Sequence, residues 1–283
     1  MTSHAELARQ IEALAAQPNL DLQAAMPVFE TLREGLESGT IRAATRAADG
    51  QWHAHAWVKQ GILLGFRLGQ VTDLSNGPFA FFDKHTYPPK PLAMEAGVRV
   101  VPGGSAIRSG SYVAPGVVCM PPMFVNVGAY VDEGGMIDSH ALVGSCAQIG
   151  KRVHLSAAAQ IGGVLEPIGA LPVVVEDDAF IGGGCGLYEG CLVGEGAVLA
   201  PGVTLTRATR LYDLVHERIL TADDRGVLAV PPNAVVVPGA RAATSAFART
   251  HGLSLYAPII IKYRDARTDA ATLLEEDLRG DQG

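Results

Sequence analysis

Aliphatic residues recur at every sixth position through the middle of the chain. The first run is unbroken from residue 107 to residue 161 and consists of Ile107, Val113, Cys119, Val125, Val131, Ile137, Val143, Ile149, Leu155 and Ile161. Neither the 3.6-residue period of an α-helix nor the two-residue alternation of an ordinary strand produces this spacing. A fixed short period predicts a repeat architecture.

The six-residue pattern is interrupted once and then resumes. The segment VLEPIGALPV separates the first run from a second one, which is shifted by two residues and consists of Val175, Ile181, Leu187, Val193, Leu199, Leu205 and Leu211. Val230 and Val236 continue the pattern after a second excursion. The residue after each aliphatic is usually small or turn-prone, which suits a sharp bend.

This pattern predicts a mainly β fold, a parallel β-helix of hexapeptide repeats. Each hexad forms one short strand and one corner, three hexads form a triangular coil, and the aliphatic side chains stack inside. Successive coils are separated by about 4.8 Å, the usual distance between paired strands. Similarity to hexapeptide-repeat proteins implies left-handed coiling, an exception to the usual right-handed crossover.

The segments on either side of the repeats have a different pattern. Residues 1–98 predict a small α/β cap domain, with a hairpin around Asp49-Gly50 and an apolar helix in WVKQGILLGFRL. Residues 99–240 are predicted to form the β-helix domain. Residues 241–283 predict an extension with a strand in SLYAPIIIKY and a terminal helix in DAATLLEEDLR, where Asp269 serves as N-cap.

Composition narrows the possible functions. Hydrophobic residues make up 48%, charged residues 18%, and there are 33 glycines, which indicates a folded, turn-rich chain. The formal charge of −7 and the absence of a basic run argue against nucleic-acid binding. The sequence has no secretion signal and no stretch long enough to span a membrane, so we expect a cytoplasmic protein.

The four cysteines, Cys119, Cys146, Cys185 and Cys191, lack metal-binding spacing, and we expect them to be reduced structural thiols.

A single prism offers little concavity, so a ligand site should form between prisms. The loops 162–174 and 212–229 can project toward a neighbour. A homotrimer with three equivalent sites between subunits suits a three-sided prism.

Several segments resemble one enzyme family. These are RVVPGGSAIRSGSYVAPGVV, MPPMFVNVGAYVDEGGMIDSHALVGSCAQIGKRVHLS, IGGVLEP, VEDDAFIG and SLYAPIIIKYRDART. They are similar to the tetrahydrodipicolinate N-succinyltransferases of the diaminopimelate and lysine pathway, over nearly the whole chain. The resemblance implies an acyltransferase that moves succinyl from succinyl-CoA to the amino group of tetrahydrodipicolinate in its ring-opened form, 2-amino-6-oxopimelate. It implies acyl-CoA as co-substrate and no metal.

Attack of an amine on a thioester requires a proton acceptor for the amine and donors for the developing oxyanion. Asp138 matches the family's acid that contacts the substrate amine, although Asp132 shows that aspartate also suits a corner for structural reasons. Arg99 matches an arginine that binds a substrate carboxylate. Ser139 and His140 replace the family's usual Thr-Trp pair, and His140 is a rival base.

The segment IGGGCGLYEG departs from the family pattern. Gly184 stands where the family has an arginine, and Gly186 where it has an acid near the amine. Glu189 matches a second acid and is retained. The loss of two charged side chains is compatible with structural drift at corners, and also with a diverged enzyme that uses acetyl-CoA or another amino acid acceptor.

The CoA moiety is expected along the later coils. By position the candidates are Gly182, Ala200, Arg207 and Lys262, each of which an ordinary coil or surface role would also explain.

Two hypotheses from other functional classes remain open, a metal-dependent hydratase and a non-catalytic scaffold. A metal-dependent hydratase needs about three converging histidines, but His140 and His154 occupy different places in their hexads, two faces apart. A non-catalytic scaffold would be compatible with Gly186. A sugar nucleotidyltransferase is disfavoured because residues 1–98 contain no glycine-rich nucleotide loop.

Overall fold

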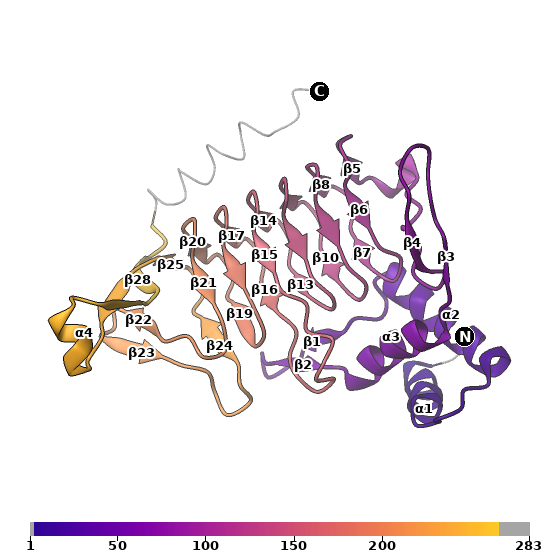
Figure 1. Ribbon diagram of the computed structural model, residues 1–283, viewed down its shortest axis with the longest axis horizontal. Coiled ribbons are helices and arrows are strands. Elements are labelled where there is room, and N and C mark those ends of the chain that lie inside the picture. Colours follow the sequence, from indigo (N-terminus) through magenta and orange to yellow (C-terminus); the bar gives the residue numbers. More distant parts are fainter. Residues whose placement is uncertain (1–2, 266–283) are drawn as a thin grey trace.

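The computed structural model describes residues 3–265, in which stacked coils form a three-sided prism between an N-terminal helical cap and a C-terminal group of hairpins (Figure 1). The predicted terminal helix at DAATLLEEDLR, with its N-cap Asp269, lies outside the described residues. The division of the chain at residues 98 and 240 stays a prediction.

Three sheets make up the sides of the prism. The first sheet contains β7 (Tyr112–Val113), β10 (Tyr130–Val131), β13 (Gln148–Ile149), β16 (Val174–Val175), β19 (Cys191–Val193) and β24 (Leu228–Val230). The second sheet contains β5 (Arg99–Val100), β8 (Val118–Cys119), β11 (Met136–Ile137), β14 (His154–Leu155), β17 (Phe180–Ile181), β20 (Val198–Leu199) and β25 (Ala234–Val237). The third sheet contains β6 (Ala106–Ile107), β9 (Phe124–Val125), β12 (Leu142–Val143), β15 (Gln160–Ile161), β18 (Gly186–Leu187) and β21 (Thr204–Leu205).

The strand register confirms the hexad prediction. Within the first run, residues that are 18 apart pair in parallel, as Val131 does with Ile149 and Ile137 with Leu155. The 14-residue step from Ile161 to Val175 absorbs the interruption, because Val175 pairs with Ile149 and the stacking continues. The inward aliphatic residues form one continuous buried cluster. Burial of this apolar stack is the main source of stability.

One predicted member of the stack, Leu211, lies in the same buried cluster but on a strand outside the coils. Leu211 is buried, but it begins β22 (Leu211–Asp213), which pairs with β23 (Arg218–Leu220) and β28 (Ile259–Tyr263) at the end of the second sheet. The position next to Val193 is taken by Val230 of β24. The chain therefore leaves the prism after Leu205 and returns at β24, and it is β24 that pairs with β19.

The C-terminal strand prediction also needs correction. SLYAPIIIKY forms two strands, β27 (Ser254–Tyr256) and β28, separated at Ala257-Pro258. Pro258 lacks an N–H and cannot complete a strand ladder at this point. β27 pairs with β26 (Ala240–Ala242), and α4 (Ala246–Thr250) lies between them in sequence.

The cap contains α1 (His4–Ala15), α2 (Leu22–Glu37) and α3 (Ala56–Leu68), the last confirming the apolar helix prediction. The hairpin around Asp49-Gly50 is also confirmed, as β1 (Ala44–Arg46) and β2 (Trp52–Ala54). A second hairpin, β3 (Val71–Asp73) and β4 (Phe82–Lys84), and the short 3-10 helix η1 (Met94–Ala96) lead into the prism.

The cap covers the first sheet. The Arg42 guanidinium lies 3.7 Å from the Tyr130 ring centroid and donates to Gln148 Oε1 at 2.9 Å. Trp52 Nε1 donates to Glu176 Oε1 at 2.8 Å, and the buried Lys59 Nζ donates to the Ala170 carbonyl at 2.6 Å. Ligand chemistry is therefore to be sought at the other two sheets and their shared edge.

Coil stacking makes the Gly144 position intolerant of a side chain. An added Cβ would overlap the backbone of Gly162 and Gly163 on the next coil, and backbone cannot move aside as a side chain can. We expect Gly144→Ala to lower the free energy of unfolding by about 1–3 kcal/mol. The control is Gly169→Ala, whose Cβ would have no neighbour within 4 Å. Thermal melting of both variants checks this, and equal melting temperatures would contradict it.

Asp213 joins the C-terminal strands. Its side chain is fully buried, and Oδ2 accepts from Tyr263 Oη at 2.9 Å, His216 Nδ1 at 2.9 Å and Arg218 Nε at 3.0 Å. Burial alone would raise its pKa, but the hydrogen bonds from His216, Tyr263 and Arg218 outweigh burial and hold the pKa below the usual value of 3.8. The ionised carboxylate is therefore the form that stabilises this end of the protein.

We expect Asp213→Asn to lower the free energy of unfolding by about 2 kcal/mol at pH 7, since buried donors lose a charged acceptor. A depressed pKa gives stability that is present above pH 3.8 and is lost as the pH falls below it. The difference between wild type and variant should therefore shrink below about pH 4. Denaturant titration at several pH values measures this, with the exposed Asp224→Asn as control; a difference that persists at low pH would refute the assignment.

Candidate functional site

Small side chains line the corners that join the second sheet to the third. Above the corner 138–141, three further corners stack, and we call these twelve residues the small-residue column: Ser156, Ala157, Ala158, Ala159, Gly182, Gly183, Gly184, Cys185, Ala200, Pro201, Gly202 and Val203. Backbone hydrogen bonds link the tiers, from Ala158 N to Ser139 O at 2.8 Å, from Gly184 N to Ala157 O at 2.9 Å and from Gly202 N to Gly183 O at 3.0 Å. A Cβ on Gly184 or Gly202 would meet nothing within 4 Å, so the column presents open surface.

Asp138 stands at the lower end of this column, directly after β11. Its Oδ1 accepts the backbone N–H of Ser139 at 2.7 Å, and the side chain is half-buried. Asp132 and Asn126 make the same contact with the residue that follows them, at 2.9 and 2.8 Å, so this contact is a feature of the corner itself. Within residues 3–265, Oδ2 of Asp138 has no hydrogen-bond partner and can accept one from a ligand.

Ser139 and His140 occupy the same corner. His140 adopts a left-handed φ of 62°, its N–H donates to Pro122 O at 2.5 Å, and its carbonyl accepts from Gln160 Nε2 at 3.1 Å. The backbone is thus fixed while the imidazole remains exposed. His154 points from β14 toward Phe180, with ring centroids 4.9 Å apart, and is not brought to His140. Across the described chain, no three His, Cys, Asp or Glu side chains are grouped as metal ligands.

Glu189 lies at a different edge from Asp138. It belongs to the corner between β18 and β19, where the third sheet leads into the first. Its Oε1 is 3.3 Å from Arg207 Nη2, an exposed ion pair. Two sequence candidates, one assigned to catalysis and one to CoA, are therefore paired with each other, and neither is near Asp138 within one protomer.

Tyr188 fills the space that the glycines leave open. A Cβ built on Gly186 would lie 2.7 Å from Tyr188 Cε2 and 3.0 Å from its hydroxyl, and one on Gly162 would lie 3.0 Å from Tyr188 Cδ1. The phenol ring therefore folds back along the outer face of the third sheet, over the position where an acidic side chain at residue 186 would begin. The two residues form one unit, because a larger residue 186 would require Tyr188 to move.

Arg99 begins β5 and is exposed at the first tier of the second sheet. Its strand pairs with β8 and β8 pairs with β11, so it lies two strand steps below the Asp138 corner, about 10 Å along the prism axis. The two side chains are thus on adjoining surfaces and not in contact.

The remaining CoA candidates have structural partners of their own. The N–H groups of Gly182 and Ala200 donate to Leu199 O and Val236 O, both at 2.8 Å, and a Cβ on Gly182 would lie 2.6 Å from Leu199 O. Close coil packing therefore explains this glycine. Lys262 pairs with Asp265 at 3.0 Å. In the column it is the N–H groups of Ala157 and Gly183 that lack an acceptor among residues 3–265.

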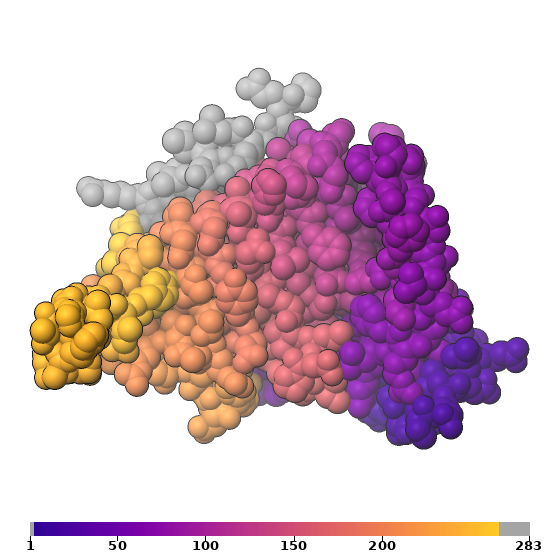
Figure 2. All heavy atoms as spheres, viewed as in Figure 1, coloured from indigo at the N-terminus to yellow at the C-terminus, as the bar shows by residue number. Residues whose placement is uncertain are grey.

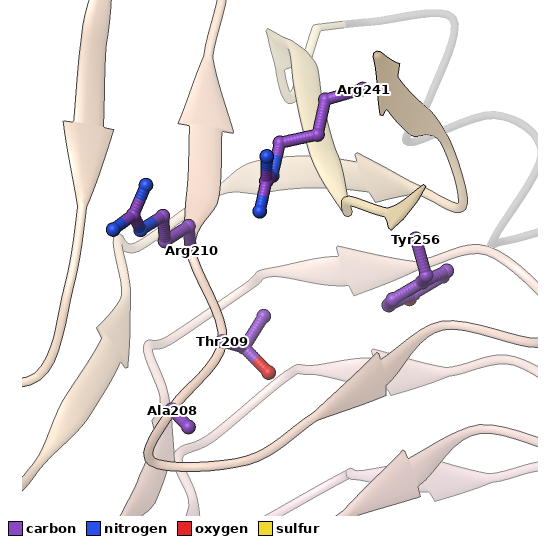
Figure 3. Close-up of a pocket in the computed structure, with 5 residues that line it drawn as sticks. All are labelled: Ala208, Thr209, Arg210, Arg241 and Tyr256. Atoms are coloured by element: carbon purple, nitrogen blue, oxygen red, sulfur yellow. The ribbon is translucent and has the colours of Figure 1, made fainter. Parts of the chain in front are cut away.

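A pocket of about 220 Å³ lies at the C-terminal end of the prism, lined by Ala208, Thr209, Arg210, Arg241 and Tyr256. In Figure 3 Arg241 extends toward Thr209, Tyr256 lies to the right, and the Arg210 side chain points away from Arg241. The Tyr256 hydroxyl accepts the N–H of Thr204, the residue that follows the column, at 2.7 Å. The sequence prediction missed these residues because they lie outside the hexad pattern; the only signal was arginine in segments that leave the prism.

The four cysteines are buried and free. Burial raises the pKa of Cys119, Cys146 and Cys191 to about 12 in each case, so at neutral pH these thiols are protonated and weakly reactive. No helix in the described part of the chain is long and apolar enough to cross a membrane.

Comparison with known proteins identifies two family models. Residues 6–68 match the model for the tetrahydrodipicolinate N-succinyltransferase N-terminal region, and residues 172–207 match the bacterial transferase hexapeptide model of six repeats. The hexapeptide match, together with the three parallel sheets, confirms the predicted mainly β fold, a left-handed parallel β-helix of hexapeptide repeats.

Curated relatives extend over most of the chain, and the three described next are each named 2,3,4,5-tetrahydropyridine-2,6-dicarboxylate N-succinyltransferase. The Acinetobacter baylyi protein is 44% identical over 89% of both chains. The Methylobacterium sp. protein is 41% identical over 98% of this chain and 99% of its own. The Maricaulis maris protein is 45% identical over 88% of both. On this similarity the chain belongs to the 2,3,4,5-tetrahydropyridine-2,6-dicarboxylate N-succinyltransferase family.

Proposed function

We propose that this protein is a CoA-dependent N-acyltransferase that moves succinyl from succinyl-CoA to the amino group of tetrahydrodipicolinate, in its ring-opened form 2-amino-6-oxopimelate. The family supports the reaction class. The observation that carries the proposal within this chain is Asp138, a half-buried carboxylate with one unengaged oxygen at the end of an open column of small residues.

The reaction needs few groups from the protein. The amine nitrogen forms a bond to the thioester carbon, the C–S bond breaks, and the proton lost by the amine is balanced by one taken up by the departing CoA thiolate. An ionised Asp138 would hold and orient the amine, and N–H groups such as those of Ala157 and Gly183 can donate to amide or thioester carbonyls along the column. The buried thiols have no part in this mechanism.

A homotrimer with sites between subunits fits the distribution of these residues. The cap already covers the first sheet, whereas outward side chains of the other two sheets, such as Met136 and Leu142, are only half-buried. Arg99 is about two strand steps from Asp138 within one protomer. A neighbouring prism could supply Arg99 for a substrate carboxylate, with Ser139 and His140 beside it. Use of acyl-CoA agrees with a cytoplasmic location.

One observation favours a second candidate, an acyltransferase that uses acetyl-CoA or another acceptor. Gly184 and Gly186 present no charged side chain, and Tyr188 lies over the second of them. An acceptor or acyl group without a carboxylate would need fewer cationic partners at this surface.

We expect Asp138→Asn to lower kcat/KM for the acylation by about 100-fold or more, because the neutral amide lacks the negative charge that holds and orients the amine. The matched control is Asp132→Asn, which alters the same corner contact on another edge and should change kcat/KM by less than about twofold. Thiol release measures turnover, and light scattering checks that assembly is unchanged. Full activity in Asp138→Asn would remove this residue from the mechanism.

The acyl donor can be tested directly by comparing thiol release from succinyl-CoA and acetyl-CoA, each with tetrahydrodipicolinate and with 2-aminopimelate. We expect turnover with succinyl-CoA to exceed that with acetyl-CoA by at least about tenfold, since the succinyl carboxylate adds a charge-assisted contact. Preference for acetyl-CoA would establish the second candidate instead. Release from neither donor would leave a binding scaffold.

A further inference from the structure

An aromatic side chain on the outer face of the third sheet has no part in the mechanism proposed so far. Tyr188 leaves the corner after β18 and remains 41% exposed. Its ring runs back over Gly186, because the atoms nearest to a Cβ built on this glycine are Cε2, Oη and Cζ of Tyr188, at 2.7, 3.0 and 3.1 Å. The phenol ring therefore occupies the space that a side chain at residue 186 would need.

The ring directs its hydroxyl toward the edge of the prism that carries Asp138. A Cβ on Gly162 would lie 3.0 Å from Cδ1, near the root of the ring, whereas the hydroxyl lies over Gly186. Gly186 follows Cys185, the last residue of its tier in the small-residue column, so the tip of the ring lies beside the column. In the described part of the chain no residue bonds to this hydroxyl, which can therefore donate to a ligand.

The surface around the hydroxyl is uncharged. The coils lie directly against one another (Figure 2), and the outward positions of the third sheet hold Ala106, Phe124, Leu142, Gln160, Gly186 and Thr204. Glu189, the acid that follows Tyr188 in the sequence, is paired with Arg207. A carboxylate at this face is therefore not repelled by the outward residues of the sheet, and a phenol O–H donates to a carboxylate in a short, charge-assisted hydrogen bond.

The separation from Asp138 suits an amino-dicarboxylate. The corner 138–141 leads into β12, and the steps from β12 to β15 and from β15 to β18 reach Gly186, about 10 Å along the axis. Three bonds of an extended chain span about 3.8 Å. In 2-amino-6-oxopimelate six bonds separate the amine nitrogen from the carbon of the remote carboxylate, which gives about 8 Å before the hydrogen bonds at both ends are added. The succinyl group spans about half of this, so the acceptor is favoured.

We propose that Tyr188 is a specificity-determining residue of the acceptor site, where its hydroxyl donates a hydrogen bond to the remote carboxylate of the amino-dicarboxylate whose amine Asp138 holds. This inference rests on the proposed acylation and names the part of the acceptor that the third sheet recognises. Gly186 belongs to the same device, because a side chain there would displace the ring.

Tyr188→Phe removes the hydroxyl and keeps the ring, so the fold should be unchanged. Loss of a hydrogen bond to a charged group should raise KM for tetrahydrodipicolinate by about tenfold or more, with kcat unchanged. KM for succinyl-CoA should stay the same. An increase in KM for succinyl-CoA alone would place the phenol at the acyl group and overturn the acceptor assignment. Unchanged KM values for both substrates would show that Tyr188 binds neither.

The matched control is Tyr112→Phe, which removes a phenol hydroxyl from β7 of the first sheet, where the ring stacks on Tyr130. It should leave both KM values unchanged. If wild type releases no thiol from succinyl-CoA with tetrahydrodipicolinate or 2-aminopimelate, the proposed function itself fails. If wild type is active and Tyr188→Phe matches it, only the assignment of Tyr188 is wrong.

Gly186→Ala tests the same contact from the other side. The added Cβ forces the ring to move, and KM for tetrahydrodipicolinate should rise by a factor similar to that in Tyr188→Phe. In the double variant KM should rise no further, because both substitutions remove one hydrogen bond. Steady-state kinetics of the four proteins measure this, and effects that multiply in the double variant would show that the two residues act separately and would overturn the proposal.

Discussion

Backbone pairing between coils is the constraint on which the rest of the structure depends. Each tier lies one strand spacing, about 4.8 Å, above the last, and the inward aliphatic side chains must fill the prism at every tier. A corner has room only for residues that permit the bend and the close approach of the next tier. This is why Gly144 and Gly182 lie against the backbone of the following coil. The same constraint produces a surface strip with few large side chains, which is what a long, narrow ligand requires.

The fold restricts where chemistry can occur. One side of the prism is covered by the cap, through the Arg42 stack on Tyr130 and the Lys59 hydrogen bond to Ala170. The edge between the second and third sheets remains, with a carboxylate at one end and cationic groups at the other. The two ends of this edge therefore differ in charge. Asp138 stands in a corner at one end, and the C-terminal hairpin carries Arg241 at the other.

Much of this architecture could be predicted from sequence, because a period of six constrains every inward residue at once. The stacking of Val131 on Ile149 and the cap hairpin at Asp49-Gly50 followed from local patterns. The burial of Leu211 also followed, but its strand pairing did not, since periodicity cannot reveal that another strand, β24, pairs with β19. The split of the C-terminal strand at Pro258 had a local signal in the proline itself.

The candidate site was predictable only in part. Asp138 could be singled out by family resemblance, but the pairing of Glu189 with Arg207 depends on which corner each residue occupies and on the stacking of these corners. From the sequence, Gly186 could be identified as the loss of an acid, but not the position of Tyr188, which the structure places over it. Arg241 and Tyr256 are brought to the prism by a hairpin that the periodicity does not describe.

The central claim is that the proposed acylation takes place at Asp138, on the edge between the second and third sheets. A crystal structure of the assembled protein with a non-hydrolysable succinyl-CoA analogue tests it most directly. The account predicts the thioester carbonyl carbon beside the carboxylate of Asp138. An analogue whose thioester lies at another edge of the prism, away from Asp138, would contradict it.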